Sequence, residues 1–288
     1  MIRPLQQDEA FLEDVRKARA VPEAFHVWWL GQSGFLLQWK QRSVLFDPYL
    51  SDSLTKKYAA TDKPHERMTE RVVAPEKLDF IDFVTSSHNH TDHLDPETLQ
   101  PLAAANPGMK FVFPAANKTV VTERLGRPWE NSIELDAGVR ADANGFSFTG
   151  IPAAHNEIER DESGRCRFLG FVVEFGPWQV YFSGDTLWHP ELVSALSSFK
   201  PDLALLPING NRPERRVAGN LDGEEAARLA KEIGAAMVIP CHYEMFAFNT
   251  VSPEPFVRAC QKLGQPHTVL RAGERWSSPG VGSRKSEI

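Results

Sequence analysis

The chain has 288 residues, of which 24% are charged and 42% hydrophobic, and its formal net charge is -6. This composition is typical of a globular protein long enough to bury a core, and the acidic balance gives no electrostatic basis for binding nucleic acid or an anionic membrane. No apolar run approaches the about 18 residues of a membrane span, and the charged, helix-prone start excludes a secretory signal. The cysteines are too few and too scattered for a disulfide framework, so a cytoplasmic location is expected.

The first third of the chain predicts a β-meander followed by a long loop. Short apolar runs separated by turns are typical of strands, and they occur at residues 25–30, 33–39 and 43–48. Residues 51–75 are polar and unpatterned, and a loop of this length in a compact domain is often functional. Residues 78–86 then predict a buried strand, and Asp95-Pro96 is typical of the start of a helix.

The rest of the chain alternates strands with helices. Further strands are expected at residues 110–113, 132–135, 146–151, 168–175 and 178–183. Two βα units follow, with helices at 222–234 and 253–264, and Asp222 with Glu225 fits a capping box. The pattern indicates a single α/β domain over residues 1–288. Within it we expect a helical N-terminal segment at residues 1–24 and a disordered tail at residues 279–288.

Five predicted strands run from apolar residues directly into a histidine or an aspartate. The residues at these strand ends are Asp47, His88, His155, Asp185 and His242. Open α/β sheets place their ligands at strand ends, so we expect these side chains to meet at one site. Any one of them alone would be an ordinary loop residue, as we expect for His26, His65, His189 and His267.

The stretch SSHNHTDH concentrates three of the nine histidines of the chain between His88 and His93. His88 and His90, two positions apart on an extended segment, point the same way and suit one ion. Asp92 and His93 come as the chain turns into a helix and face a second ion. Imidazole and carboxylate ligands favour Zn²⁺, with Mn²⁺ or Fe²⁺ as alternatives, and Asp185 is the natural bridging carboxylate. The sequence therefore predicts two divalent metal ions per chain.

These motifs resemble the metallo-β-lactamase superfamily in sequence and in order. The matching pieces are FDP with Asp47, HNHTDH from His88 to His93, PAAH with His155, SGDT with Asp185 and PCHY with His242. The resemblance implies a four-layer αββα sandwich, in which two mixed β-sheets face one another and helices cover both outer faces. It also implies one ion held by His88, His90 and His155, a second held by Asp92, His93 and His242, and Asp185 bridging the two. Asp47 would orient a ligand imidazole.

Within the superfamily the chain is similar to the L-ascorbate 6-phosphate lactonase group. The shared stretches are WWLGQSGFLLQ, VLFDPYLSD and the segment from LPINGNRPERR to IPCHYEMF. The group has Asn-Pro-Arg-Gly where this chain reads Asn211-Arg212-Pro213-Glu214-Arg215. Flavodiiron oxidoreductases of the same fold carry Glu at the position of His90, so this histidine favours the hydrolytic branch. A non-enzymatic metal protein is disfavoured because all seven ligands are present.

The resemblance implies a hydrolase that opens a lactone, such as a sugar-phosphate lactone. A water bridging the two metals, with its pKa lowered towards about 7, would give a hydroxide that attacks the carbonyl. Asp185 would bridge the ions, and Asp92 or Tyr243 would return the proton, although Tyr243 is equally well explained as a packing residue. The alternative is a metal-dependent phosphodiesterase acting on RNA, a cyclic nucleotide or a phospholipid.

The expected partner is a small anionic substrate such as a sugar phosphate, with no nucleic acid or membrane partner, and the resemblance is compatible with a homo-oligomer. Forked donors in the segment 209–216 suit a phosphate or carboxylate, and the candidates there are Asn211, Arg212 and Arg215. Trp188 is a candidate for the pocket wall, and the weaker cationic candidates are Lys56, Lys57 and Arg67. The alternative for the segment 209–216 is a solvated loop, and the alternative for Trp188 is a position that covers the core. Cys241 is expected to face the core, because adjacent strand residues point to opposite faces.

Overall fold

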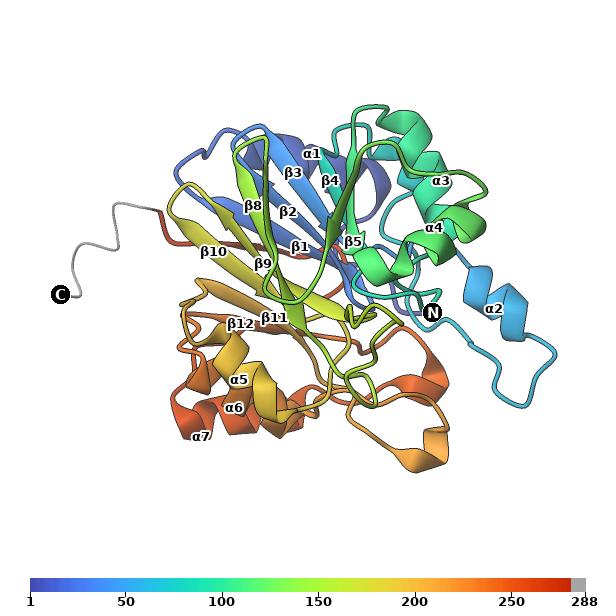
Figure 1. Cartoon of the computed structure of the whole chain (residues 1–288). Coiled ribbons are helices and arrows are strands. Elements are labelled where there is room, and N and C mark those ends of the chain that lie inside the picture. Colours follow the sequence, from blue (N-terminus) through green and yellow to red (C-terminus); the bar gives the residue numbers. More distant parts are fainter. Residues whose placement is uncertain (281–288) are drawn as a thin grey trace.

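Two mixed β-sheets pack face to face in the computed structural model, which describes residues 1–280 (Figure 1). The seven-stranded sheet contains, in spatial order, β13 (Arg275–Ser277), β1 (Phe25–Gly31), β2 (Gly34–Trp39), β3 (Arg42–Phe46), β4 (Phe83–Thr85), β5 (Lys110–Pro114) and β6 (Ser132–Leu135). The six-stranded sheet contains β12 (Val238–Cys241), β11 (Leu203–Pro207), β10 (Trp178–Phe182), β9 (Leu169–Phe175), β8 (Phe146–Pro152) and β7 (Arg140–Ala143). Each sheet combines antiparallel and parallel pairs.

Helices cover the outer face of each sheet (Figure 1). On the side of the seven-stranded sheet lie α1 (Asp8–Ala18), α3 (Pro96–Ala105) and α4 (Lys118–Leu125). On the side of the six-stranded sheet lie α5 (Pro190–Leu196), α6 (Gly223–Glu232) and α7 (Glu254–Leu263). The short helix α2 (Ser53–Tyr58) projects at one edge of the sandwich. This arrangement confirms the predicted four-layer αββα fold.

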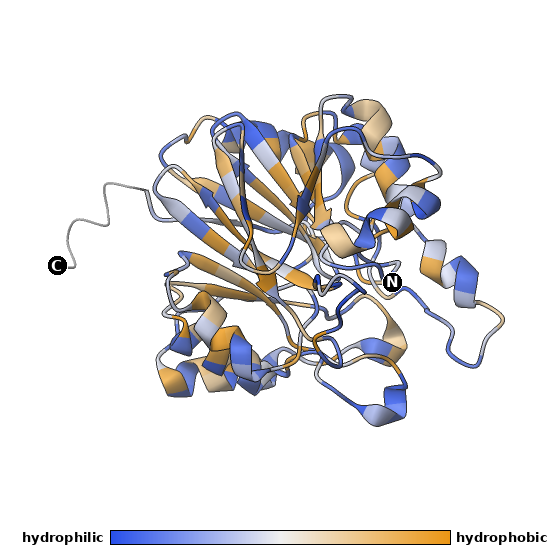
Figure 2. Cartoon of the chain, in the orientation of Figure 1, coloured by the Kyte–Doolittle hydropathy of each residue, from blue (hydrophilic) through white to orange (hydrophobic). Residues whose placement is uncertain are grey.

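The core lies between the two sheets, where aromatic side chains of opposite sheets meet. Phe25 of β1 packs edge-on against Phe175 of β9 with ring centroids 5.5 Å apart, and Phe83 of β4 lies 5.0 Å from Phe148 of β8. The strands are correspondingly the most apolar part of the chain (Figure 2). Burying one such side chain stabilises the fold by about 1.5–3 kcal/mol, so the sheet-to-sheet contact dominates the stability of the sandwich.

Helix starts follow the predicted chemistry. The Asp95 side chain caps α3 by accepting a hydrogen bond from the backbone N–H of Glu97, and Pro96 occupies the first helical position. At α6 the Asp222 carboxylate accepts from the backbone N–H groups of Glu224 and Glu225, while the Glu225 side chain reaches back to the cap. The capping box is thereby confirmed, and the strands expected at residues 168–175 and 178–183 form β9 and β10, which pair antiparallel.

Several elements differ from the sequence prediction. The strand expected over residues 78–86 shortens to β4, because the Asp82 side chain accepts hydrogen bonds from Arg42 and from the backbone of Ser43 just before it. Part of the predicted loop 51–75 forms helix α2. The elements α4, β7 and β13 were not predicted, because each is short and lacks a clear apolar period. Short 3₁₀ turns occur at Pro75–Lys77, Ala115–Asn117, Pro213–Arg215 and Ala247–Asn249.

The ends of the chain were predicted to be a helical segment over 1–24 and a disordered tail over 279–288. Helix α1 lies within the first of these. Residues 281–288 of the predicted tail lie outside the described part of the chain. None of the helices within residues 1–280 combines the length and the apolarity needed to cross a lipid bilayer.

Candidate metal centre

The predicted ligands come from loops that follow strands of both sheets. The loop after β4 in the seven-stranded sheet carries His88, His90, Asp92 and His93. The loops after β8, β10 and β12 of the six-stranded sheet carry His155, Asp185 and His242 respectively. The potential ligand atoms of His88, His90 and His155 lie within 4.8 Å of one another, and these residues are here called the first ligand group. The potential ligand atoms of Asp92, His93 and His242 also lie within 4.8 Å of one another, and these residues are called the second ligand group. The structure therefore groups these six residues as the resemblance implied.

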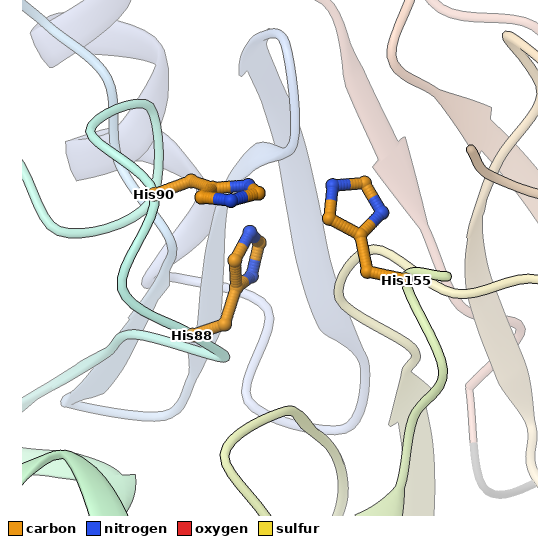
Figure 3. Close-up of side chains that lie close together, drawn as sticks. All are labelled: His88, His90 and His155. Carbon is orange, nitrogen blue, oxygen red and sulfur yellow. The ribbon is translucent and has the colours of Figure 1, made fainter. Parts of the chain in front are cut away.

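The first ligand group consists of three imidazoles that face a common space (Figure 3). His88 and His90 come from one loop and His155 from the opposite one, with ring centroids 4.6 to 5.3 Å apart. Burial lowers the pKa of all three imidazoles, that of His90 to about 4, so they are neutral at neutral pH. Neutral imidazole is the form that binds a metal ion.

Hydrogen bonds orient the rings of the first ligand group. His155 Nδ1 lies 2.8 Å from the carbonyl oxygen of Gly219, and His88 Nδ1 lies 2.9 Å from the Ser87 hydroxyl. Each bond leaves Nε2 for the common space, and His88 Nε2 is buried without a hydrogen-bond partner. A buried, partnerless nitrogen is costly unless a ligand satisfies it, so this geometry fits a bound cation.

The second ligand group contains a carboxylate and a strongly supported imidazole. Asp47 Oδ2 lies 2.7 Å from His93 Nδ1, which places Asp47 behind the ligand as predicted. Asp47 itself accepts hydrogen bonds from the Thr85 hydroxyl and the backbone N–H of Ser87. His93 Nε2 faces the site, where Asp185 Oδ2 lies 3.4 Å away, and it makes no hydrogen bond of good geometry within residues 1–280. Asp47, His88 and His93 also lie within 4.8 Å of one another, but the carboxylate is already engaged by these donors.

Asp185 lies between the two groups. Its Oδ2 atom is 3.6 Å from His155 Nε2 of the first group and 3.4 Å and 3.3 Å from His93 and His242 Nε2 of the second. Burial opposes the charge of Asp185, but the imidazoles of His242 and His93 hold its pKa well below the usual range. Contacts to imidazoles of both groups are what a bridging carboxylate requires.

The charge balance of the site favours a cation next to His93. Burial opposes a charged imidazole there, but the carboxylates of Asp185 and Asp92, together with the Asp47 hydrogen bond, raise the pKa of His93 well above its usual value. Burial also opposes the charge on Asp92, whose pKa is nevertheless held below its usual value by His93. The carboxylates thus stabilise positive charge at this point, which a bound divalent ion would supply. The donor set of imidazole and carboxylate fits Zn²⁺, Mn²⁺ or Fe²⁺.

A glycine permits the close approach of the two loops. Gly184, with φ of +59°, precedes Asp185, and a Cβ atom at this position would lie 2.5 Å from Cβ of Ser87. No real Cβ tolerates that contact, and a positive φ is itself unfavourable for other residues. The glycine of SGDT therefore lets Asp185 reach the loop that carries His88.

Several predicted catalytic and substrate residues lie away from the ligands. The Tyr243 hydroxyl is buried and donates a hydrogen bond to the carbonyl of Leu270, while its ring stacks on Trp29 with centroids 4.3 Å apart. Its role as a proton donor is therefore not supported, and Tyr243 is a packing residue. Trp188 packs against the hydrophobic core, and the guanidinium carbon of Arg228 lies 4.6 Å from the centroid of its ring. Trp188 does not line the cavity at the ligands.

The segment 209–216 also differs from its predicted role. Arg215 donates hydrogen bonds to the carbonyls of Asn209 and Thr250, which makes it a structural side chain. Asn211 and Arg212 line a different cavity, together with Glu224 and Thr250. None of these three predicted substrate residues lines the cavity at the ligands. What the neighbouring stretch contributes instead is the Gly219 carbonyl that orients His155.

A cavity of about 460 Å³ opens over the ligand groups. Besides the ligands, its walls include Lys57, Tyr58, His65, Arg124, Phe246 and Phe248. His65 stacks on Tyr58 with centroids 4.2 Å apart and meets Phe248 edge-on at 4.6 Å, so it belongs to an aromatic wall rather than to a ligand group. Lys56 and Arg67, the other weak cationic candidates, instead pair with Glu97 and Asp52.

Gln32 is a functional candidate that the sequence patterns missed. Its amide Nε2 lies 2.8 Å from Asp92 Oδ2 and 3.0 Å from His242 Nε2. The residue sits with φ of +50° in the turn between β1 and β2, where the sequence signalled only a turn. By contrast, Cys241 lies in the hydrophobic core, as expected from its place beside His242 on the strand.

Comparisons with known proteins identify the family. A model described as the Beta-lactamase superfamily domain matches residues 42–243. A UPF0173 metal-dependent hydrolase of Rubrobacter xylanophilus is 30% identical over 244 residues, which cover 82% of this chain and 89% of that protein. A second UPF0173 metal-dependent hydrolase, from Hyperthermus butylicus, is 27% identical over 253 residues, covering 86% of this chain and 97% of the relative.

Solved structures share the same fold. An isothiocyanate hydrolase from Delia radicum gut bacteria superimposes with a TM-score of 0.70 at 20% identity, covering 88% of this chain and all (100%) of that chain. Igni18, a metallo hydrolase from Ignicoccus hospitalis, gives a TM-score of 0.65 at 22% identity and covers 89% of this chain and 99% of its own. The sandwich, the site and the matching family model lead to one conclusion: the chain belongs to the metallo-β-lactamase superfamily and is a metal-dependent hydrolase.

Proposed function

We propose that the protein uses two divalent metal ions to open a lactone, or a related cyclic ester, of a small anionic molecule. The position of Asp185 carries the proposal of two ions, because a single oxygen of its buried carboxylate lies within 3.3 to 3.6 Å of imidazole nitrogens from both ligand groups. A lactone substrate is supported by the similarity of the chain to the L-ascorbate 6-phosphate lactonase group. This similarity extends to the turn that carries Gln32.

Bound divalent ions would lower the pKa of water and stabilise negative charge developing on a carbonyl oxygen. The residues of the chain orient the reaction around them. The Asp92 side chain is 16% exposed, and its carboxylate is ionised, so it is suited to accept a proton from the attacking water and return it to the leaving oxygen. Gln32, whose amide reaches Asp92, holds that carboxylate in place.

The size of the cavity favours a small substrate over a polymer. A volume of about 460 Å³ is within the range of small-molecule pockets, which is about 300 to 1,000 Å³. Its aromatic wall of Tyr58, His65, Phe246 and Phe248 suits the flat or apolar part of such a molecule. An RNA substrate would need a basic surface, and the net charge of -6 does not provide one.

The test combines metal counting with two assays. The protein is purified anaerobically with Mn²⁺ or Zn²⁺, and metal ions per chain are counted beside hydrolysis of δ-gluconolactone 6-phosphate and of bis-p-nitrophenyl phosphate. We expect about two ions and lactone opening, and His90→Ala should lose one ion and reduce turnover by roughly 100-fold or more, as the loss of a ligand does. His267→Ala, a half-buried histidine outside the site, is the matched control and should change neither.

The outcomes separate the alternatives. Two ions with cleavage of the phosphodiester alone would replace the lactonase by a phosphodiesterase. One ion in the unmodified protein would disprove the dinuclear centre while leaving a mononuclear hydrolase. Unchanged activity in His90→Ala would remove the first ligand group from the reaction altogether.

A further inference from the structure

Two cationic side chains line the cavity over the ligands without an anionic partner. Lys57 belongs to α2, and its Nζ lies 5.2 Å from the ring centroid of the adjacent Tyr58. Arg124 belongs to the last turn of α4, on the side where the cavity meets His90. Among residues 1–280, no carboxylate oxygen lies closer than 4.0 Å, the limit for an ion pair, to a side-chain nitrogen of Lys57 or Arg124.

Three other cations near this cavity are paired with carboxylates. Lys56, the neighbour of Lys57 on α2, lies 2.7 Å from Glu97. Arg67 lies 2.7 Å from Asp52, and Arg216 lies 2.6 Å from Asp62. Lys57 and Arg124 differ from these three cations because they line the cavity and form no ion pair with a carboxylate of the described residues. Cations of this kind offer binding energy to an anionic ligand.

Lys57 is held over the cavity by a segment that is tied at several points. This segment, residues 51–67, is here called the strap. The Thr55 hydroxyl donates to the carbonyl of His65 at 2.7 Å, which closes the strap on itself. Lys63 Nζ donates to the carbonyl of Arg216 at 2.6 Å, which ties the strap to the residue that precedes Val217 and Ala218 of the cavity wall. The backbone beneath Lys57 is thus positioned before any ligand arrives.

Arg124 is oriented by only part of its guanidinium. One terminal nitrogen, Nη1, donates to the carbonyl of Asn89, the residue between two ligand histidines. The other donors, Nε and Nη2, have no partner among the described residues. The guanidinium is half-buried, and burial lowers the pKa of Arg124, although an arginine remains positively charged at neutral pH. A fixed, half-buried fork with donors to spare suits the paired oxygens of a phosphate or carboxylate.

We propose that Lys57 and Arg124 bind a phosphate group of the substrate that is separate from the bond being hydrolysed. The proposal rests on the proposed function for the reacting bond but not for the recognition of the anion. It replaces the arginines of the segment 209–216 as the anion-binding residues. Specificity for an anionic substrate then depends on one residue from the strap and one from α4.

The test compares two ligands that differ only by a phosphate. Metal-loaded protein is titrated by calorimetry with gluconate and with 6-phosphogluconate, which share the carboxylate that metal ions attract. We expect 6-phosphogluconate to bind about 10-fold or more tightly, because a charge-assisted contact is worth roughly one factor of ten or more. Lys57→Met and Arg124→Met should each reduce that preference severalfold. Lys56→Met, which removes the same charge one residue away, should retain it.

Each result decides the proposal. A wild-type protein that binds both ligands equally, or a preference that survives in both Lys57→Met and Arg124→Met, overturns it. Arg124→Met also removes the bond to Asn89, so its metal content is measured as well, and Lys57→Met decides alone if that content falls. Because binding needs no turnover, loss of preference in Lys57→Met supports the proposal even where lactone hydrolysis fails. Hydrolysis without any anion preference would contradict this proposal alone.

Discussion

The two ligand groups of this site differ in how they are prepared for a metal ion. The first, His88, His90 and His155, consists only of imidazoles, and burial keeps them neutral. The second includes the Asp92 carboxylate, and the surrounding carboxylates favour positive charge on His93. The imidazoles of the first group are therefore already in the neutral form that binds a metal ion, because they are buried. In the second group, His93 must release a proton before it can bind an ion. A motif of seven residues thus produces two half-sites with different chemistry.

The largest effect is expected from the residue that the two half-sites share. Asp185→Asn keeps the shape of the side chain but removes the charge that faces both groups. Removing one partner of a buried charge pair costs about 3–5 kcal/mol, so turnover should fall by roughly 1000-fold, with metal lost from both groups. Activity and metal content measure this. Asp222→Asn, which removes a helix-capping carboxylate outside the site, is the control. Retention of two tightly bound ions in Asp185→Asn would exclude the bridging role.

A smaller and one-sided effect is expected behind the second group. Asp47→Asn weakens the hydrogen bond to His93 Nδ1, and such partners are typically worth roughly 10- to 100-fold in metal affinity. Titration of the metal-free protein with Zn²⁺ should show that the binding step of the second group weakens more than that of the first, because Asp47 reaches His88 only through the Ser87 hydroxyl. An equal loss in both steps would mean that the groups do not differ in the way described above.

The smallest effect is expected from pH. His93 has a raised pKa and must release its proton to bind an ion, so protons compete with the metal in the second group as pH falls through that raised value. The His90 imidazole, with a pKa of about 4, stays neutral over the same range. Dialysis from about pH 7.5 to about pH 5.5 should thus lower the metal content from two ions towards one. Loss of both ions together would contradict the assignment.

The ligand groups were accessible from the sequence because their signal is local. HNHTDH places four candidate ligands at fixed offsets, and His155, Asp185 and His242 each follow an apolar strand directly. The strands that carry these residues end at the same edge of the sandwich in both sheets, so the pattern along the chain predicted a cluster in space. The αββα layers followed from the family resemblance that these same motifs carry.

The cavity wall was not accessible in the same way. Lys57 and Tyr58 lie in a polar stretch without periodicity, and only the tertiary ties of the strap turn them toward the site. Arg215 shows the reverse error, because its charge suggested a ligand while the fold uses it to bind two backbone carbonyls. Which cations remain without a partner depends on contacts between distant segments, and sequence patterns do not report those contacts.

The placement of the ligands on both sheets has a consequence for how the protein is made. Each ligand group joins residues of the loop after β4 to a residue from the opposite sheet, so each bound ion would act as a cross-link between the two halves of the sandwich. A chain emerging from the ribosome completes the first group once His155 has been added, whereas the second waits for His242, which follows β12. The order of synthesis therefore makes the ligands of the all-imidazole half-site available before those of the second half-site are complete.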